Sequence, residues 1–176
     1  MKGNIFLENL EIILIALLIV IPVRYFIIQP FIVHGSSMEP NFYSNDYLIV
    51  DELSYRFHTP QRYEILVFRA PNHPQQYYIK RIIGLPGETV DIHDDQVFIT
   101  NKNGKSFQLK EDFISSSVTT VGNVKITLDN QQYYVLGDNR PISSDSRNWG
   151  PLDEDLIIGR VWLRLWPIQR IEAYHF

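Results

Sequence analysis

The chain has 176 residues, a length that suits one modest domain plus an appendage. Its hydrophobic residues (45%) and charged residues (20%) are those of a folded protein rather than a disordered one. The net charge of −4 argues against a nucleic-acid-binding protein, and the absence of cysteine excludes disulfides, zinc–thiolate sites and a cysteine nucleophile.

The N-terminal segment is strongly apolar, and residues 12–23 contain no ionisable side chain. A membrane-spanning helix needs about 20 mostly apolar residues, and residues 7–28 supply that length if Arg24 reaches the membrane interface. A cleaved secretory signal is the alternative, but the run is not followed by a small-x-small cleavage site. We therefore expect a short N-terminal stretch over 1–6 and an uncleaved transmembrane anchor over 7–28.

Residues 29–176 are predicted to form one β-rich domain. Short apolar runs alternate with turn residues, and after residue 33 there is no long helical period and no internal repeat. The runs at 89–92 and 96–99 have the spacing of a hairpin. The predicted fold class is an all-β domain of antiparallel, coiled or barrel-like sheets, preceded by one N-terminal transmembrane helix.

A candidate nucleophile lies in the first turn of this domain. Ser37 follows an apolar strand, and Gly35 and Pro40 bracket it in a sharp turn. A turn can expose a hydroxyl and aim backbone N–H groups at one point, as acyl transfer requires. Serines between glycine and proline are also common as plain turn residues, so the local sequence leaves both interpretations open.

A serine nucleophile needs a base, and Lys80 is a better candidate than any histidine. Lys80 lies in a strand with apolar neighbours, where desolvation would lower its pKa from about 10.4 toward about 8. An exposed strand lysine is the alternative. None of the five histidines lies in a motif typical of a Ser-His-Asp site: His34, His58, His73, His93 and His175.

Residues 137–147 form a third polar segment. Asp145 and Arg147 are suited to an ion pair or to backbone hydrogen bonds, and Ser143 is suited to orienting a lysine amine. A structured polar loop without a chemical role is the alternative interpretation.

Together, these segments resemble bacterial type I signal peptidases in their compact, Gram-positive-like form. The resemblance covers nearly the whole chain. Three motifs carry it: Gly35-x-Ser37-Met38-x-Pro40, Ile79-Lys80-Arg81-x-x-Gly84-x-Pro86-Gly87 and Gly137-Asp138-Asn139-Arg140-x-x-Ser143-x-Asp145-Ser146-Arg147.

The resemblance implies a membrane-bound serine endopeptidase with a Ser–Lys dyad that cleaves signal peptides from exported pre-proteins after small residues. Ser37 would be the nucleophile and Lys80 the general base, without a metal or other cofactor. Ser143 would orient the lysine amine, while Asp138, Asp145 and Arg147 would support the site. The expected substrate pocket is formed by Phe31, Val33, Met38, Val67, Tyr78 and Ile79.

The resemblance also implies the partners and the location of the chain. Signal peptides of exported pre-proteins and the lipid bilayer are the expected partners, and no nucleic acid is expected. The chain would cross the cell membrane once, with a cytoplasmic N-terminus and an extracytoplasmic catalytic domain.

The chain departs from the family pattern beside its candidate nucleophile. Gly35 stands where some members have a serine that assists the oxyanion hole, and Asn41 and Phe42 stand where threonine and leucine are common. Other functions also remain to be weighed. A self-cleaving repressor-type protease would need a DNA-binding segment, and a penicillin-binding-type acyltransferase would need Ser-x-x-Lys. An inactive β module that binds exported peptides is the rival from a different class.

Overall fold

A computed structural model describes residues 9–18, 28–115 and 117–174. The larger of its two sheets contains eight strands in this described part, and all neighbouring strands are antiparallel. Its order is β1-β2-β11-β3-β4-β9-β10, with β12 paired to β11. The strands are β1 (Ile28–Ile32), β2 (Tyr47–Asp51), β3 (Ile65–Ala70), β4 (His73–Gly84), β9 (Gln132–Leu136), β10 (Leu152–Asp153), β11 (Ile157–Trp166) and β12 (Glu172–Ala173).

The larger sheet is irregular rather than flat. Its register shifts between β11 and β2, between β11 and β3, between β3 and β4, and between β4 and β9. Such bulges bend a strand and increase its twist, which produces a coiled sheet. The antiparallel, mostly β fold predicted from the sequence is confirmed, and the described strands form an open sheet that ends at β1 and β10.

The smaller sheet is a regular four-stranded unit with the order β7-β6-β5-β8. Its strands are β5 (Thr89–His93), β6 (Gln96–Thr100), β7 (Ser106–Gln108) and β8 (Val124–Thr127). Asp94 and Asp95, between β5 and β6, both have positive φ angles, of 49° and 61°. A two-residue turn of this kind matches the twist of the two strands, so the predicted hairpin is confirmed.

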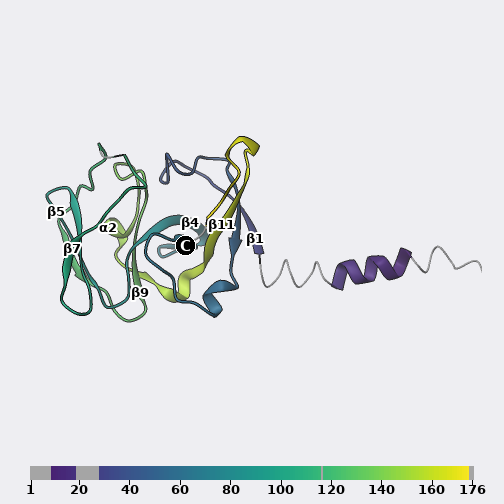
Figure 1. The fold of residues 1–176 in the computed structure, drawn as a ribbon, viewed down its shortest axis with the longest axis horizontal. Helices are drawn as coiled ribbons and strands as arrows, with labels where there is room; N and C mark the ends of the chain where they lie inside the picture. The colour runs from purple at the N-terminus through teal and green to yellow at the C-terminus, as the bar shows by residue number, and fades with distance from the viewer. Residues whose placement is uncertain (1–8, 19–27, 116, 175–176) are drawn as a thin grey trace, which may run out of the picture.

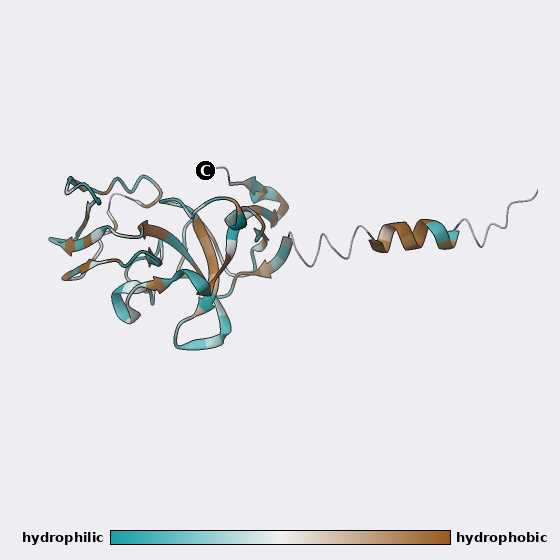
Figure 2. Cartoon of the chain, turned by 90° about the horizontal axis from the view of Figure 1, so that it is seen from below, coloured by the Kyte–Doolittle hydropathy of each residue, from teal (hydrophilic) through white to brown (hydrophobic). Residues whose placement is uncertain are grey.

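Figure 1 shows the two sheets beside each other, with β5 and β7 at one end and β1 and β11 at the other. Short helices connect the strands of the larger sheet. They are the 3-10 helices η1 (Ser54–Arg56), η2 (Glu154–Leu156) and η3 (Ile168–Arg170), and the α-helix α2 (Ser146–Trp149). Apolar strands run through the middle of the domain in Figure 2.

Residues 9–18 are helical and mostly apolar, as the colours of Figure 2 show, and all their side chains are exposed. Within the described ranges, no helix is both long enough and apolar enough to cross a membrane. Residues 19–27 of the predicted anchor, and residues 1–8, lie outside the described residues.

Candidate active site

The turn that carries Ser37 is held from two sides. Val33, just before it, exchanges backbone hydrogen bonds with the segment at Asn45 and Asp46. On the other side, Asn139 donates its backbone N–H to the Ser37 carbonyl oxygen (3.0 Å) and its side-chain amide to the Ser36 carbonyl oxygen (3.1 Å). These bonds fix the backbone on both sides of the Ser37 hydroxyl.

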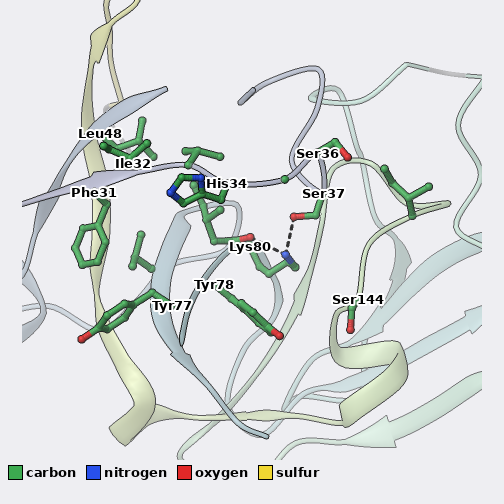
Figure 3. Close-up of a pocket in the computed structure, with 15 residues that line it drawn as sticks. Phe31, Ile32, His34, Ser36, Ser37, Leu48, Tyr77, Tyr78, Lys80 and Ser144 are labelled. Carbon is green, nitrogen blue, oxygen red and sulfur yellow. Dashed lines mark hydrogen bonds between the residues drawn. The ribbon is translucent and has the colours of Figure 1, made fainter. Parts of the chain in front are cut away.

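Lys80 comes from β4, where it pairs with Leu66 of β3 in the middle of the larger sheet. Its side chain is nearly inaccessible to solvent, and the whole residue is only 4% exposed. The amine Nζ lies 2.8 Å from Ser37 Oγ and donates to the Ile79 carbonyl oxygen at 2.9 Å. Figure 3 shows the amine directed at the Ser37 hydroxyl, with Tyr78 below it. Two residues that are 43 positions apart in the chain are thus within hydrogen-bond distance.

Burial lowers the pKa of the Lys80 amine from its ordinary value to about 8, because an ammonium loses its hydration inside the protein. The carboxylates of Asp145 and Asp138 oppose this change by favouring the charged form. Near neutral pH, a usable fraction of this amine is therefore uncharged and able to accept a proton from a hydroxyl within reach.

A cleft of about 350 Å³ opens beside the two side chains. Five of the residues predicted to form the substrate pocket line it: Phe31, Val33, Val67, Tyr78 and Ile79. Met38 does not line it. It is 1% exposed and packs in the apolar cluster that includes Val33 and Val67. The pattern of apolar residues around Ser37 could not distinguish a residue that lines the cleft from one beneath it.

The sequence interpretation missed several other residues that line the cleft. They are Ile32, His34, Ser36, Leu48, Tyr77, Ile142 and Ser144, most of which are labelled in Figure 3. Tyr77 extends the apolar wall, and its ring contacts that of Phe31 edge-on, with the ring centroids 5.3 Å apart. Its alternation with Ile79 in β4 was the available signal, because alternate residues of one strand share a face.

Asp138 forms a buried ion pair beside Lys80. Its carboxylate accepts two hydrogen bonds from Arg81, at 2.8 Å and 2.6 Å, and the two side chains are 0% and 7% exposed. Arg81 also lies over the ring of Phe113, 4.3 Å from its centroid. The pair joins β4 to the segment that follows β9.

Asp145 organises the segment that ends at Arg147. It is the N-cap of α2 in a capping box with Asn148, and it accepts hydrogen bonds from Arg147 and from the backbone N–H of Gly137. A Cβ on Gly137 would lie 2.5 Å from the Ser37 carbonyl oxygen and would overlap Ser143 Oγ. The backbone of residue 137 therefore lies against the turn of Ser37, as only glycine permits.

Ser143 is 8% exposed, and its hydroxyl has no hydrogen-bond partner among the described residues. The hydrogen bonds of Lys80 Nζ go to Ser37 and Ile79 instead. The predicted role of Ser143 in orienting the amine therefore stays a prediction. Across the described ranges, no group of three or more potential metal-binding side chains gathers at one place.

A buried lysine amine against a serine hydroxyl is an arrangement suited to nucleophilic catalysis. Sequence comparison assigns the chain to a family. A sequence model described as "Signal peptidase, peptidase S26" matches residues 6–166. The chain belongs to the signal peptidase S26 family. It is accordingly a serine endopeptidase that removes signal peptides.

Relatives cover nearly the whole chain. The probable signal peptidase I-2 of Synechocystis is 38% identical over 175 residues, covering 96% of this chain and 77% of the relative. Signal peptidase I P of Bacillus subtilis subsp. natto is 35% identical over 175 residues, covering 97% and 94%. A crystal structure of a signal peptidase I from Enterococcus faecalis covers 58% of this chain and 97% of that chain, at 33% identity and a TM-score of 0.49.

Proposed function

We propose that Ser37 is the nucleophile and Lys80 the general base of signal-peptide cleavage. The uncharged amine accepts the Ser37 hydroxyl proton as Oγ attacks the scissile carbonyl carbon. The proton then passes to the leaving nitrogen, the mature protein departs with a new amino terminus, and an ester to Ser37 remains. Lys80 next activates water, which releases the signal peptide. The observation that carries this proposal is the 2.8 Å separation of a buried amine and a serine hydroxyl.

The negative charge that develops on the carbonyl oxygen needs a hydrogen-bond donor. Gly35 supplies no side-chain hydroxyl at the position where some family members have one. The backbone N–H of Ser37 is the candidate donor, because it has no acceptor among the described residues. Gly35, with a φ of 88°, gives the turn a left-handed conformation that bulkier residues disfavour.

The substrate is proposed to bind as an extended strand beside β4. Strand β4 pairs with β9 only from Arg81 onward, so the backbone of Tyr78 and Ile79 keeps a free edge among the described strands. An added strand would gain main-chain hydrogen bonds there. Bulky side chains such as Leu48 and Val67 line the cleft, which supports selection of small residues near the cleavage site.

We propose further that residues 7–28 cross the bilayer once, with a cytoplasmic N-terminus and the β domain outside. The apolar run of residues 12–23 supports this proposal. Such an anchor would hold the enzyme in the bilayer that also holds its substrates, which raises the effective concentration of each for the other. Retention of the full chain in membranes after extraction at alkaline pH tests the anchor, and release of the chain would contradict it.

The dyad is tested by two substitutions in the full chain. Ser37→Ala and Lys80→Ala should each reduce cleavage of a signal-peptide-bearing pre-protein by at least about 10³-fold, because each removes one member of a unit. Asn101→Leu, in a surface turn of the smaller sheet, is the control for a change outside the cleft. Retention of more than about a tenth of the activity in either dyad variant would remove the proposed mechanism.

A further inference from the structure

Asp138 accepts hydrogen bonds from more than its ion-pair partner. Its Oδ2 atom also receives the side-chain amide of Asn41 at 2.8 Å. Asn41 lies four residues after Ser37 and closes the turn that carries it. One buried carboxylate therefore holds two segments together: the strand of Lys80, through Arg81, and the turn of Ser37, through Asn41.

The other hydrogen-bonding groups of Asn41 are also used. The same side-chain amide donates to the Phe113 carbonyl oxygen at 2.7 Å, and the Asn41 carbonyl oxygen accepts from Arg164 at 2.5 Å. The ring of Phe113 covers the guanidinium of Arg81. Asn41 is thus fixed from three directions, and it is not among the residues that line the cleft.

We propose that Asn41 is a positioning residue of the reaction, which sets the separation of Ser37 Oγ and Lys80 Nζ by joining the turn of one to the strand of the other through Asp138. The inference rests on the proposed roles of Ser37 and Lys80 and adds a residue that determines their geometry. The common threonine at this position has one donor, whereas asparagine has two and can bridge Asp138 and Phe113 together.

This role predicts a specific kinetic pattern. Because Asn41 lies outside the cleft, its loss should lower kcat and leave KM nearly unchanged. A displacement of about 1 Å in a reacting pair can cost about a hundredfold in rate, so a looser turn should cost about ten- to a hundredfold. Loosening also admits water to the amine, which favours the ammonium and moves the ascending limb of the pH–rate profile to higher pH.

The experiment compares full-length variants in detergent, with a pre-protein as substrate. Asn41→Leu removes both donors at similar size, and Asn41→Thr keeps one. Asn101→Leu is the matched control, because it also removes an asparagine that makes two side-chain hydrogen bonds, in a turn of the smaller sheet. Thermal unfolding of each variant is measured beside kcat, KM and the pH–rate profile. Ser37→Ala is run in parallel as the test of the dyad itself.

The expected result is a lower kcat in Asn41→Leu with an alkaline shift of its pH limb, a smaller change of both in Asn41→Thr, and neither in Asn101→Leu. An unmoved pH limb in the Asn41 variants would overturn the proposal, even if activity fell with stability. If Asn41→Leu does not fold, the same two readouts in Asn41→Thr decide. Activity in Ser37→Ala would instead refute the dyad and is distinguishable from failure of the Asn41 proposal.

Discussion

The two sheets of this protein differ in what they bury. The buried strand residues of the smaller sheet are apolar, and in β5 the buried Val90 and Ile92 alternate with half-buried residues. The larger sheet buries charged residues as well, including Lys80 and Arg81 of β4 and Arg164 of β11. Its central strand β3 is covered on both faces, because four consecutive residues of β3 are buried.

Within the larger sheet, the buried cations differ in their partners. Arg81 pairs with Asp138 and Arg164 with Glu172, each at 2.6 Å. Lys80 takes part in no ion pair of the described residues, and its amine faces a serine hydroxyl. Since a buried charge without a partner is costly, the surroundings of Lys80 favour the neutral amine more than water does. The buried cation without a carboxylate partner is the one suited to catalysis.

The largest loss of stability should come from removing the cation of a buried ion pair in the larger sheet. Arg81→Met leaves the buried Asp138 carboxylate without its counter-ion and should destabilise the protein by about 3–5 kcal/mol. Urea unfolding measures this change. The double variant Arg81→Met with Asp138→Leu should recover part of the loss, because no uncompensated charge remains. A loss below about 1 kcal/mol in the single variant would contradict the comparison.

Lys80, which has no ion-pair partner within the described part of the chain, should lower the stability of the folded state while it is charged. The folded state lowers the pKa of Lys80 to about 8, so between about pH 8 and pH 10.5 the unfolded chain binds more protons than the folded one. The contribution of Lys80 to the free energy of unfolding therefore rises with pH. Relative to Lys80→Met, the wild type should gain about 2 kcal/mol in free energy of unfolding from about pH 7 to pH 10. A pH-independent difference would mean that the amine is solvated.

The smallest effect is expected for an ion pair of the smaller sheet. Lys125 lies 2.9 Å from Asp91, but its side chain is 73% exposed. Surface pairs contribute under about 1 kcal/mol, so Lys125→Met should change stability by less than that and leave the pH–rate profile unaltered. A loss of stability in Lys125→Met as large as that in Arg81→Met would contradict the proposed difference between the two sheets.

The regular parts of the fold were predictable from the sequence because local patterns determine them. The hairpin of β5 and β6 follows from alternating residues and a two-residue turn. The short strands β7, β10 and β12 were not predicted, since two or three residues carry no period and pairing partners decide their structure. The coiling of the larger sheet arises from bulges that no local pattern marks.

At the candidate site, the motifs directed attention to Ser37, Lys80 and the ion pair of Asp145 and Arg147. Hydrogen-bond partners that are distant in the chain could not be predicted from the sequence. Asp138 pairs with Arg81 and Asn41 from segments 57 and 97 residues away. Met38 illustrates the same limit, because an apolar residue beside the nucleophile can lie under the cleft rather than in it.

The pH dependence of kcat/KM for pre-protein cleavage tests the neutral Lys80 amine most directly. We expect activity to rise about tenfold per pH unit below the pKa and to level off above about pH 8, since only the uncharged amine accepts the Ser37 proton. A limb near pH 6.5, the ordinary range of a histidine, would contradict the assignment of Lys80 as the base.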